Sequence, residues 1–387
     1  MINTIINIIE ETMMNDLYIS IADFLSTKDM FNLSYICKDS YSSLMYSQYN
    51  MTIHAMKLNK HKKNLEFIAN LPYKIYNLNL NNNGNLTDYD FKYLKGIHTL
   101  NIKNCRQNTI TDNAFVHLKG IHTLDISECC QEKITDNAFE NLQGIHTLNM
   151  SRCNQETITD RTFQYLKGIY SLNMSSCNQN TITDKAFENL KGIHTLNISN
   201  CNQRTITDRA FKYLKGINTL CMERCNEINI TDKAFEYLKG IHTLNMSFCN
   251  QITDKAFENL KGIHTLNMKC CNKITDKAFE NLKGTHTLNM SSCFQKTITD
   301  KTFEYLRGIH TLNMSTCFQN TITDNAFENL KGIDTLNMSN CNQNTITDKA
   351  FVHLKGINTL NMSNCNQNTI TDKTFHYFQS IYNYEEL

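Results

Sequence analysis

Histidine and cysteine are the residues whose type and spacing could support chemistry in this 387-residue sequence. Eight histidines, among them His98, His122, His242 and His310, each stand one residue before the threonine of a recurring Thr-Leu pair. Imidazoles stacked at the spacing of neighbouring strands could titrate together or bind a transition metal. The first hypothesis to weigh is therefore a histidine-based metal site.

Substitutions along the histidine column weaken that hypothesis. Tyr170, Asn218, Asp334 and Asn358 replace histidine in other copies of the motif. A metal-binding histidine usually donates its second ring N–H to a carboxylate or carbonyl, and we expect no carboxylate to orient these rings. The sequence favours a column of surface histidines without a metal or catalytic role.

The sixteen cysteines divide into a column and a few extra residues. Twelve of them, from Cys105 to Cys365, occupy one position of a repeat, where neighbouring side chains point the same way and cannot bridge easily. The adjacent pairs Cys129–Cys130 and Cys270–Cys271 lack the Cys-x-x-Cys spacing of zinc sites. A cysteine seven residues along a strand from the histidine lies roughly 20 Å away, too far for a catalytic pair. We expect buried free thiols in a reducing compartment.

Other classes of function are excluded by composition and motifs. The sequence contains no phosphate-binding loop, nucleophile elbow or paired carboxylates, so we expect no enzyme, no cofactor and no metal. Its 38 basic and 37 acidic residues give a net charge of +1, which offers no electrostatic reason for binding nucleic acid or a membrane surface. The N-terminal apolar run carries acids and lacks a basic segment, and we expect no membrane span. A soluble, intracellular and cytoplasmic protein is predicted.

A repeat of 24 residues positions all of these side chains. The Thr-Asp pair that marks each unit recurs from Asp88 to Asp372, and two steps of 22 residues lie between Asp232 and Asp276. A fixed period in the twenties predicts a solenoid of stacked units. The array is expected over residues 75–378, followed by a tail at 379–387.

One unit is sufficient to predict the local structure. Ile193, Leu196 and Ile198 alternate with polar residues before Cys201, which indicates a short strand with one buried face. An isolated unit leaves two sides of its core in water, so parallel strands must stack with helices outside. Such connections are right-handed.

The second half of the unit predicts a helix of about two turns. Thr207 or Asp208 can cap its N-terminus, and Ala210, Phe211 and Leu214 supply an apolar face. The glycine that follows suits a left-handed C-terminal exit.

The pattern L-x-x-L-x-L-x-x-C, followed by Ile-Thr-Asp and a short helix, resembles the cysteine-containing subclass of leucine-rich repeats. The resemblance implies an α/β fold: a right-handed, horseshoe-shaped solenoid with a parallel sheet on its concave face and short helices outside. The first unit, at Ile75, Leu78, Leu80 and Asn83, carries asparagine in place of cysteine and is expected to close the core.

Residues 11–50 do not repeat and are expected to form helices. Apolar positions recur at helical spacing on either side of Ser26-Thr27-Lys28-Asp29. The segment DLYISIADFLSTKDMFNLSYICKDSYSSL resembles an F-box, with Met13-Met14 at the usual Leu-Pro opening and Ser40 at the usual tryptophan. Residues 51–74 form a junction. The resemblance implies docking onto the Skp-type adaptor of a cullin-RING ubiquitin ligase through Met13, Leu17, Ile21, Phe24, Leu25, Met30, Leu33 and Ile36.

These two resemblances together identify an F-box/leucine-rich-repeat protein, a class whose members recruit substrates and catalyse nothing. The chain is rich in Asn and Ile, has no Trp and one Pro, and is similar to such proteins of amoeba-infecting giant viruses. That similarity implies a host protein as target and the host cytoplasm as location. The alternative is a repeat scaffold without a ligase partner. In it the N-terminal helices cap the solenoid and bury Leu17, Phe24, Leu25 and Met30 against Ile75 and Leu78.

The concave face is the candidate target-binding surface. Alternation predicts a polar Thr-Asn-Ser series there, copy after copy, and recent duplication alone could account for such uniformity. Departures from it are the candidate contacts: Lys103, Asp125, Arg152, Glu223, Arg224, Phe248 and Lys269, with Cys221 beside them. Phe294 and Phe318, each directly after the column cysteine, are expected to be exposed on the rim.

Overall fold

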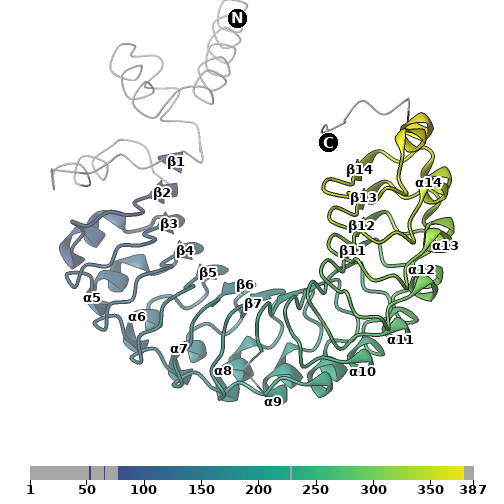
Figure 1. Ribbon diagram of the computed structural model, residues 1–387. Coiled ribbons are helices and arrows are strands. Elements are labelled where there is room, and N and C mark those ends of the chain that lie inside the picture. The colour runs from purple at the N-terminus through teal and green to yellow at the C-terminus, as the bar shows by residue number, and fades with distance from the viewer. Residues whose placement is uncertain (1–51, 54–64, 66–76, 227–228, 379–387) are drawn as a thin grey trace, which may run out of the picture. The chain divides into compact units, whose positions relative to one another are not determined.

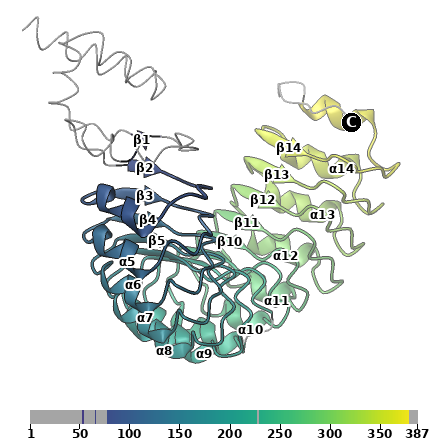
Figure 2. The same cartoon turned by 90° about the vertical axis from the view of Figure 1, so that its left-hand side faces the viewer.

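The structure is a computed structural model that describes residues 52–53, 65, 77–226 and 229–378 (Figures 1 and 2). The predicted F-box-like module at 11–50, with all eight positions from Met13 to Ile36, lies outside the described residues, as does the tail 379–387. The chain divides into two compact units, and the boundary follows Leu148.

Each repeat contributes one short strand, and neighbouring strands within a unit pair in parallel and in sequence order. The strands of the first unit, the last of which crosses the boundary, are β1 (Thr52–Ile53), β2 (Asn77–Asn79), β3 (Thr99–Asn101), β4 (Thr123–Asp125) and β5 (Thr147–Asn149). Those of the second are β6 (Ser171–Asn173), β7 (Thr195–Asn197), β8 (Thr219–Cys221), β9 (Thr243–Asn245), β10 (Thr265–Asn267), β11 (Thr287–Asn289), β12 (Thr311–Asn313), β13 (Thr335–Asn337) and β14 (Thr359–Asn361).

The strand register is fixed by leucine. Leu196 faces Leu172 on one side and Leu220 on the other, so identical side chains lie in rows. Strand β1 falls inside the segment 51–74 and pairs with β2 in the same parallel manner. A shift by one residue would expose the whole apolar set, which is why the row of leucines specifies the pairing.

Short helices follow the strands and cover the other face of the sheet in each unit (Figure 1). In the first unit they are η1 (Asp88–Leu94), α5 (Asp112–Phe115), η2 (Val116–Leu118) and α6 (Asp136–Glu140), where η denotes a 3₁₀ helix. In the second they are α7 (Asp160–Gln164), α8 (Asp184–Phe187), η3 (Glu188–Leu190), α9 (Asp208–Phe211), η4 (Lys212–Leu214), η5 (Asp232–Tyr237), α10 (Asp254–Phe257), α11 (Asp276–Phe279), α12 (Asp300–Tyr305), α13 (Asp324–Phe327), η6 (Glu328–Leu330), α14 (Asp348–Phe351), η7 (Val352–Leu354) and η8 (Asp372–Phe378). None of the described helices is long and apolar enough to cross a bilayer.

Both ends of each helix are set by local chemistry. The side chain of Thr207 accepts a hydrogen bond from the backbone N–H of Arg209, 3.2 Å away, so the threonine is the N-cap. Gly216 follows the last turn with φ +85°, a conformation that glycine adopts at low cost. The predicted caps are therefore confirmed, with threonine taking the role that the sequence left open between Thr207 and Asp208.

The aspartate after each cap has a different role: it binds the next repeat. The carboxylate of Asp184 accepts hydrogen bonds from the backbone N–H of Thr207 at 2.7 Å and from its hydroxyl at 2.8 Å. The carboxylate of Asp208 accepts the same two hydrogen bonds from Thr231. The Thr207 hydroxyl thus donates to one repeat while it accepts from its own helix. This Asp–Thr pairing recurs along each unit and ties successive helices together.

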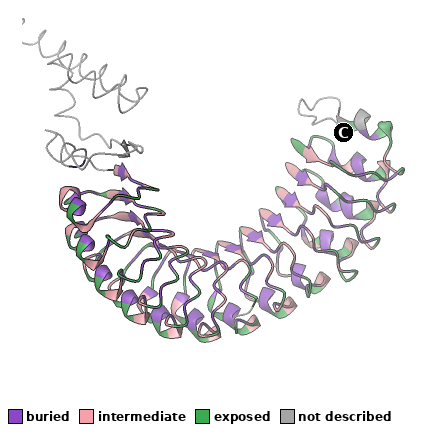
Figure 3. Cartoon of the chain, turned by 60° about the vertical axis from the view of Figure 1, so that its left-hand side comes forward, coloured by how far each residue is buried: buried purple, intermediate pink, exposed green. Residues whose placement is uncertain are grey.

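The core lies between the sheet and the helices (Figure 3). Leu196, Ile198, Cys201, Ile206 and Phe211 are all fully buried, and the same five positions are buried in copy after copy. Burial of side chains of this size contributes roughly 1.5 to 3 kcal/mol each relative to exposure. The predicted fold of stacked strand–loop–helix units, a leucine-rich-repeat solenoid, is confirmed.

The cysteine column is part of this core. The fifteen cysteines of the described residues are free thiols. Cys201 donates its S–H to the carbonyl of Met174 at 3.1 Å, and burial raises the pKa of its thiol to about 12. The atypical first unit places Asn83 at the same buried position, where its side chain accepts the backbone N–H of Asn85. The buried thiols of the column pack as small apolar groups and are poor nucleophiles.

Candidate functional site

The strand face presents threonine and asparagine but not the full series that alternation predicts. Thr195 and Asn197 are half-buried, whereas Ser199 is only 7% exposed. The Oδ1 of Asn197 accepts the backbone N–H of Ser199 at 2.9 Å, an Asx turn that ends the strand. Because the chain bends there, the alternation stops, and the predicted display of serine is wrong for Ser127, Ser199, Ser247, Ser291 and Ser339.

The residue before each column cysteine adopts a left-handed conformation. Asn200 has φ +55°, and asparagine tolerates this region well. Arg152, Arg224 and Phe248 stand at the same position with φ +59°, +56° and +62°. Left-handed backbone costs a side chain with a branched or bulky Cβ substituent about 1 to 2 kcal/mol. Asparagine is the commonest residue at this position, and arginine and phenylalanine adopt the same backbone conformation at greater cost.

Four of the predicted contacts gather at the ends of β8, β9 and β10 in the second unit. The guanidinium carbon of Arg224 lies 4.5 Å from the ring centroid of Phe248, and the Lys269 ammonium lies 5.7 Å from it. Both are within cation–π range. Glu223 approaches Arg224 with Oε1 3.9 Å from Nε and accepts a hydrogen bond from Asn245 at 3.4 Å. We call Glu223, Arg224, Phe248 and Lys269 the Phe248 cluster.

The Phe248 cluster is accessible. The Arg224 side chain is 54% exposed and Glu223 31% exposed, and Phe248 is half-buried. The cluster joins two cations, one anion and an aromatic ring within four loop positions. Such a surface can bind carboxylates and apolar side chains at once, and aromatic and arginine residues are the side chains that dominate protein interfaces.

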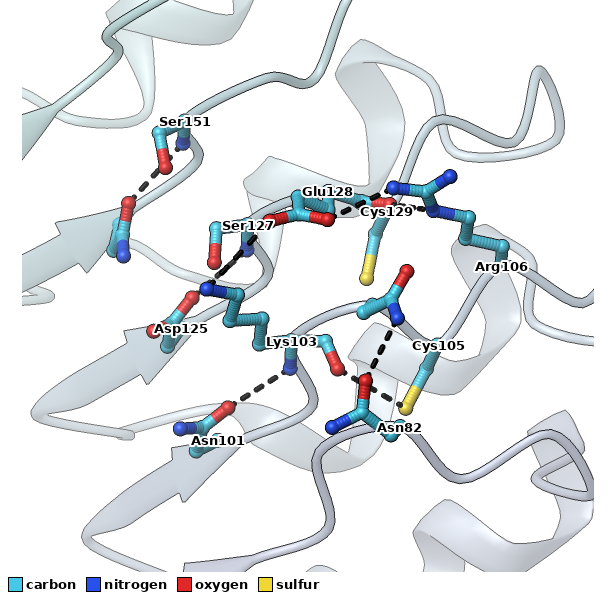
Figure 4. Close-up of polar contacts among 12 residues, drawn as sticks. Asn82, Asn101, Lys103, Cys105, Arg106, Asp125, Ser127, Glu128, Cys129 and Ser151 are labelled. Atoms are coloured by element: carbon cyan, nitrogen blue, oxygen red, sulfur yellow. Dashed lines mark hydrogen bonds and ion pairs between the residues drawn. The ribbon is translucent and has the colours of Figure 1, made fainter.

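Two further predicted contacts lie in the first unit, where a second charged cluster forms (Figure 4). Lys103 Nζ is 3.5 Å from Glu128 Oε1, and Arg106 Nη2 is 2.8 Å from Glu128 Oε2. Asp125 accepts the backbone N–H of Ser127 at 2.8 Å, the same turn that asparagine makes in other copies. Arg106 and Glu128 were missed by the sequence analysis, although both depart from the asparagine common at their positions.

The remaining predicted contact, Arg152, is exposed at the left-handed position of its repeat, and its backbone N–H donates to the carbonyl of Ser175 at 2.8 Å. Neither Arg152 nor the first-unit residues is part of the Phe248 cluster. Cys221 is half-buried, with its sulfur 2.9 Å from the hydroxyl oxygen of Ser199.

The histidine column forms stacks of parallel rings. His242, His264, His286 and His310 follow one another with ring centroids 4.6, 4.6 and 4.2 Å apart. Desolvation and then the neighbouring rings lower the pKa of His264. In the first unit His122 has its pKa lowered in the same way. Both shifts favour the neutral form of these two rings.

One expectation about this column is wrong. Asp334 replaces histidine in the next repeat, and its carboxylate lies 2.8 Å from Nδ1 of His310, so a carboxylate does orient one ring. Elsewhere Nδ1 contacts the hydroxyl of the adjacent threonine, as His242 does with Thr243 at 3.1 Å. Within the described ranges, no three His, Cys, Asp or Glu side chains converge as a metal site would require.

An exposed aromatic pair lies in the two repeats that directly follow the Phe248 cluster. Phe294 and Phe318 are 47% and 49% exposed, as predicted, and their rings stack with centroids 5.4 Å apart and planes at 9°. Both follow the column cysteine directly. Apolar rings of this size rarely remain in water without a partner when they form a contiguous patch.

Comparison with known proteins gives one family and a set of similar folds. Residues 70–180, 156–286 and 296–385 match the BspA type leucine rich repeat region. No curated protein sequence matches the chain. Among solved structures, Toll in the Drosophila Toll–Spatzle complex has a TM-score of 0.60 at 14% identity over 77% of this chain and 45% of its own. Mouse RP105 with MD-1 has a TM-score of 0.52 at 15% identity, covering 75% and 58%.

The yeast Rad7 and Elc1 complex also matches, with a TM-score of 0.49 at 18% identity over 90% of this chain and 94% of that one. The chain spans about half the length of the two Toll structures. At these identities the Toll and RP105 structures show a shared fold alone.

Proposed function

The chain belongs to the BspA-type leucine-rich repeat family, and from this premise we propose that it is a non-catalytic receptor whose repeat array binds a target protein. The observation that carries the proposal is the Phe248 cluster. Arg224 and Phe248 occupy left-handed positions that asparagine fills at lower cost, and together with Lys269 they form an exposed cationic and aromatic surface.

A binding function suits the chemistry of the described residues. The column thiols have raised pKa values because they are buried, and the stacked histidines make their contacts with threonine, with each other or with Asp334. The strand face offers mainly hydrogen-bonding threonine and asparagine, with Asp125 and Cys221 as exceptions. Toll with Spatzle and RP105 with MD-1 are protein complexes of the same fold, which supports a protein target here.

Affinity capture with a reverted variant tests this proposal. Glu223→Ser, Arg224→Asn and Lys269→Ser each install the residue found at the same position in a neighbouring repeat, and Phe248→Asn installs the residue found two repeats away at Asn200, so the fold should be retained. We expect the intact chain to enrich a protein from host lysate that the reverted variant loses. A matched control, Lys255→Asn, Lys277→Asn and Lys301→Asn, changes exposed lysines at the helix face and should keep that protein. Equal capture by all three chains would overturn the proposal.

For the N-terminal region we propose docking onto a Skp-type adaptor and, through it, a cullin complex. The support is the F-box resemblance at residues 11–50, directly upstream of a repeat array. In that arrangement the target would be carried to a ubiquitin ligase in the cytoplasm, the compartment that suits a chain with so many free thiols. If the chain is viral, as its composition suggests, the ligase belongs to the host.

Co-purification with the adaptor separates this proposal from the alternative, in which the N-terminal helices only cap the array. The intact chain should capture the adaptor stoichiometrically, and a chain lacking residues 1–50 should not. Phe24→Asp with Leu25→Asp should abolish capture while the circular dichroism of the repeats is unchanged. If this double substitution instead unfolds the repeats and the intact chain captures no adaptor, the helices are a cap.

A further inference from the structure

The loops that follow β8 to β12 in the second unit carry more bases than acids. We call residues 222–226, 229–230, 246–252, 268–274, 290–298 and 314–322 the rim loops. Their charged residues are one acid, Glu223, and four bases: Arg224, Lys269, Lys273 and Lys296. Arg224 is 54% exposed, Lys273 and Lys296 are exposed, and Lys269 is half-buried. The described part of the rim loops therefore carries a net charge of +3. Glu227, in the loop after β8 but outside the described residues, lowers the sequence charge of these five loops to +2, in a chain whose total is +1.

Aromatic residues interrupt a polar series in the same loops. In most repeats an asparagine follows the column cysteine, and successive asparagines hydrogen-bond: the N–H of Asn202 donates to Oδ1 of Asn178 at 2.8 Å, and that of Asn366 to Asn342 at 2.7 Å. Phe294 and Phe318 replace this series with two stacked rings that are 47% and 49% exposed. The substitution forfeits the hydrogen bonds and places apolar surface in water.

Repeat geometry puts these features at a spacing that one extended peptide can bridge. Neighbouring strands are about 4.8 Å apart, so Phe248 and Phe294, two repeats apart, are separated by about 10 Å along the rim loops. Lys269 lies in the repeat between them, 5.7 Å from the ring centroid of Phe248. A peptide of about three extended residues covers roughly the same length.

We propose that the rim loops bind an acidic segment of the target protein that also carries apolar side chains. Carboxylates of the segment pair with Arg224, Lys269, Lys273 and Lys296, and its apolar side chains pack on the exposed ring faces of Phe294 and Phe318. This inference rests on the proposed function and specifies its partner. Arg224 is the strongest anchor for a carboxylate because its guanidinium is already held over Phe248 and can donate two parallel N–H bonds.

Protein is favoured over nucleic acid as the occupant for two reasons. A phosphate backbone carries a charge at every nucleotide and could not avoid repulsion by Glu223, which lies 3.9 Å from Arg224. The chain as a whole is nearly neutral, whereas nucleic-acid-binding proteins concentrate a large positive charge. A protein segment can place its carboxylates opposite the four bases and a neutral residue opposite Glu223.

Selection from a random peptide library displayed on phage tests the inference on the full-length chain. We expect the selected peptides to be enriched in Asp and Glu together with Phe, Leu or Ile. Phe294→Asn with Phe318→Asn installs the neighbouring residue type and should weaken the best peptide about tenfold or more, since aromatic anchors dominate interfaces. Lys269→Ser, Lys273→Gln and Lys296→Asn should weaken it about fivefold at low salt, and the effect should shrink as salt is raised.

The helix-face control, Lys255→Asn, Lys277→Asn and Lys301→Asn, removes the same charge and should leave peptide affinity within twofold. Selection of basic or neutral peptides, or of none, overturns the inference. So does tighter binding of single-stranded RNA than of the best peptide. If a target is captured through the Phe248 cluster but acidic peptides are not selected, the proposed function stands and only this specification of the partner fails.

Discussion

The Asp–Thr pairing between repeats leads to a quantitative prediction, because its members differ in the number of bonds they make. The Asp276 carboxylate accepts three hydrogen bonds, from the N–H of Thr299 at 2.9 Å, its hydroxyl at 2.7 Å and the Thr302 hydroxyl at 2.6 Å. Asp300 accepts two, both from Thr323. Among the described residues, Asp372 accepts none from a following repeat.

The expected loss follows from this count. A net hydrogen bond is worth about 1 kcal/mol, and the partly buried site keeps each near that value although the acceptor is charged. Asp276→Ala should therefore lower the free energy of unfolding by about 3 kcal/mol and Asp300→Ala by about 2 kcal/mol. Asp372→Ala removes only the favourable interaction with a helix N-terminus, about 0.3 to 1 kcal/mol.

Urea unfolding followed by circular dichroism measures these differences, provided that the slope with urea is unchanged among the variants. The order Asp276, Asp300, Asp372 is the essential result. If Asp372→Ala costs as much as Asp276→Ala, or if Asp276→Ala lies within 0.5 kcal/mol of the wild type, the carboxylates do not hold the repeats together and the reasoning is refuted.

Three further predictions concern the same scaffold. Burial acts to raise the pKa of Asp348, but hydrogen bonds from Thr371 and Thr374 outweigh it and lower the pKa below the usual value. The stabilising contribution of the Asp348 carboxylate is thus present above the unfolded pKa of about 3.9 and lost as pH falls through the lower folded pKa. Asp348→Asn should therefore weaken the dependence of the unfolding free energy on pH in this acid range. Thiol labelling under native conditions should modify exposed Cys130 and leave Cys201, whose pKa is about 12, unmodified until unfolding; equal rates at the two would contradict the buried column. Gly216→Ala at φ +85° should cost about 1 kcal/mol in thermal or urea unfolding, whereas Gly84→Ala, with open space around it and no left-handed φ, should cost less than half of that.

The sequence predicted the repeat unit well because each element depends on neighbours within about 20 residues. Strand β7 at Thr195–Asn197, helix α9 at Asp208–Phe211 and buried Cys201 all follow from apolar spacing and a capping threonine. The left-handed conformation of Gly216 at the C-terminal end of this helix also depends only on the local sequence. Because the sequence repeats, a correct prediction for one unit applied to every unit of the array.

What the sequence did not show depends on contacts between repeats or on the place where a strand ends. The binding of Thr231 by Asp208, 23 residues away, requires the stacked geometry, and so does the pairing of His310 with Asp334. Burial of Ser199 was missed because an Asx turn ends the alternation one step early. Departures from the repeat did identify the Phe248 cluster, whereas Arg106 and Glu128 of the first-unit cluster were passed over.

Site-specific photocrosslinking tests the central claim of target binding at the Phe248 cluster most directly. A benzoylphenylalanine replaces Phe248 in one chain and Val352 in another, the latter being a 45% exposed residue on the helix side. The account predicts a discrete protein adduct from position 248 that disappears with Arg224→Asn and Lys269→Ser, and none from position 352. The same adduct from both positions, or none from position 248 while the target is still captured, would contradict it.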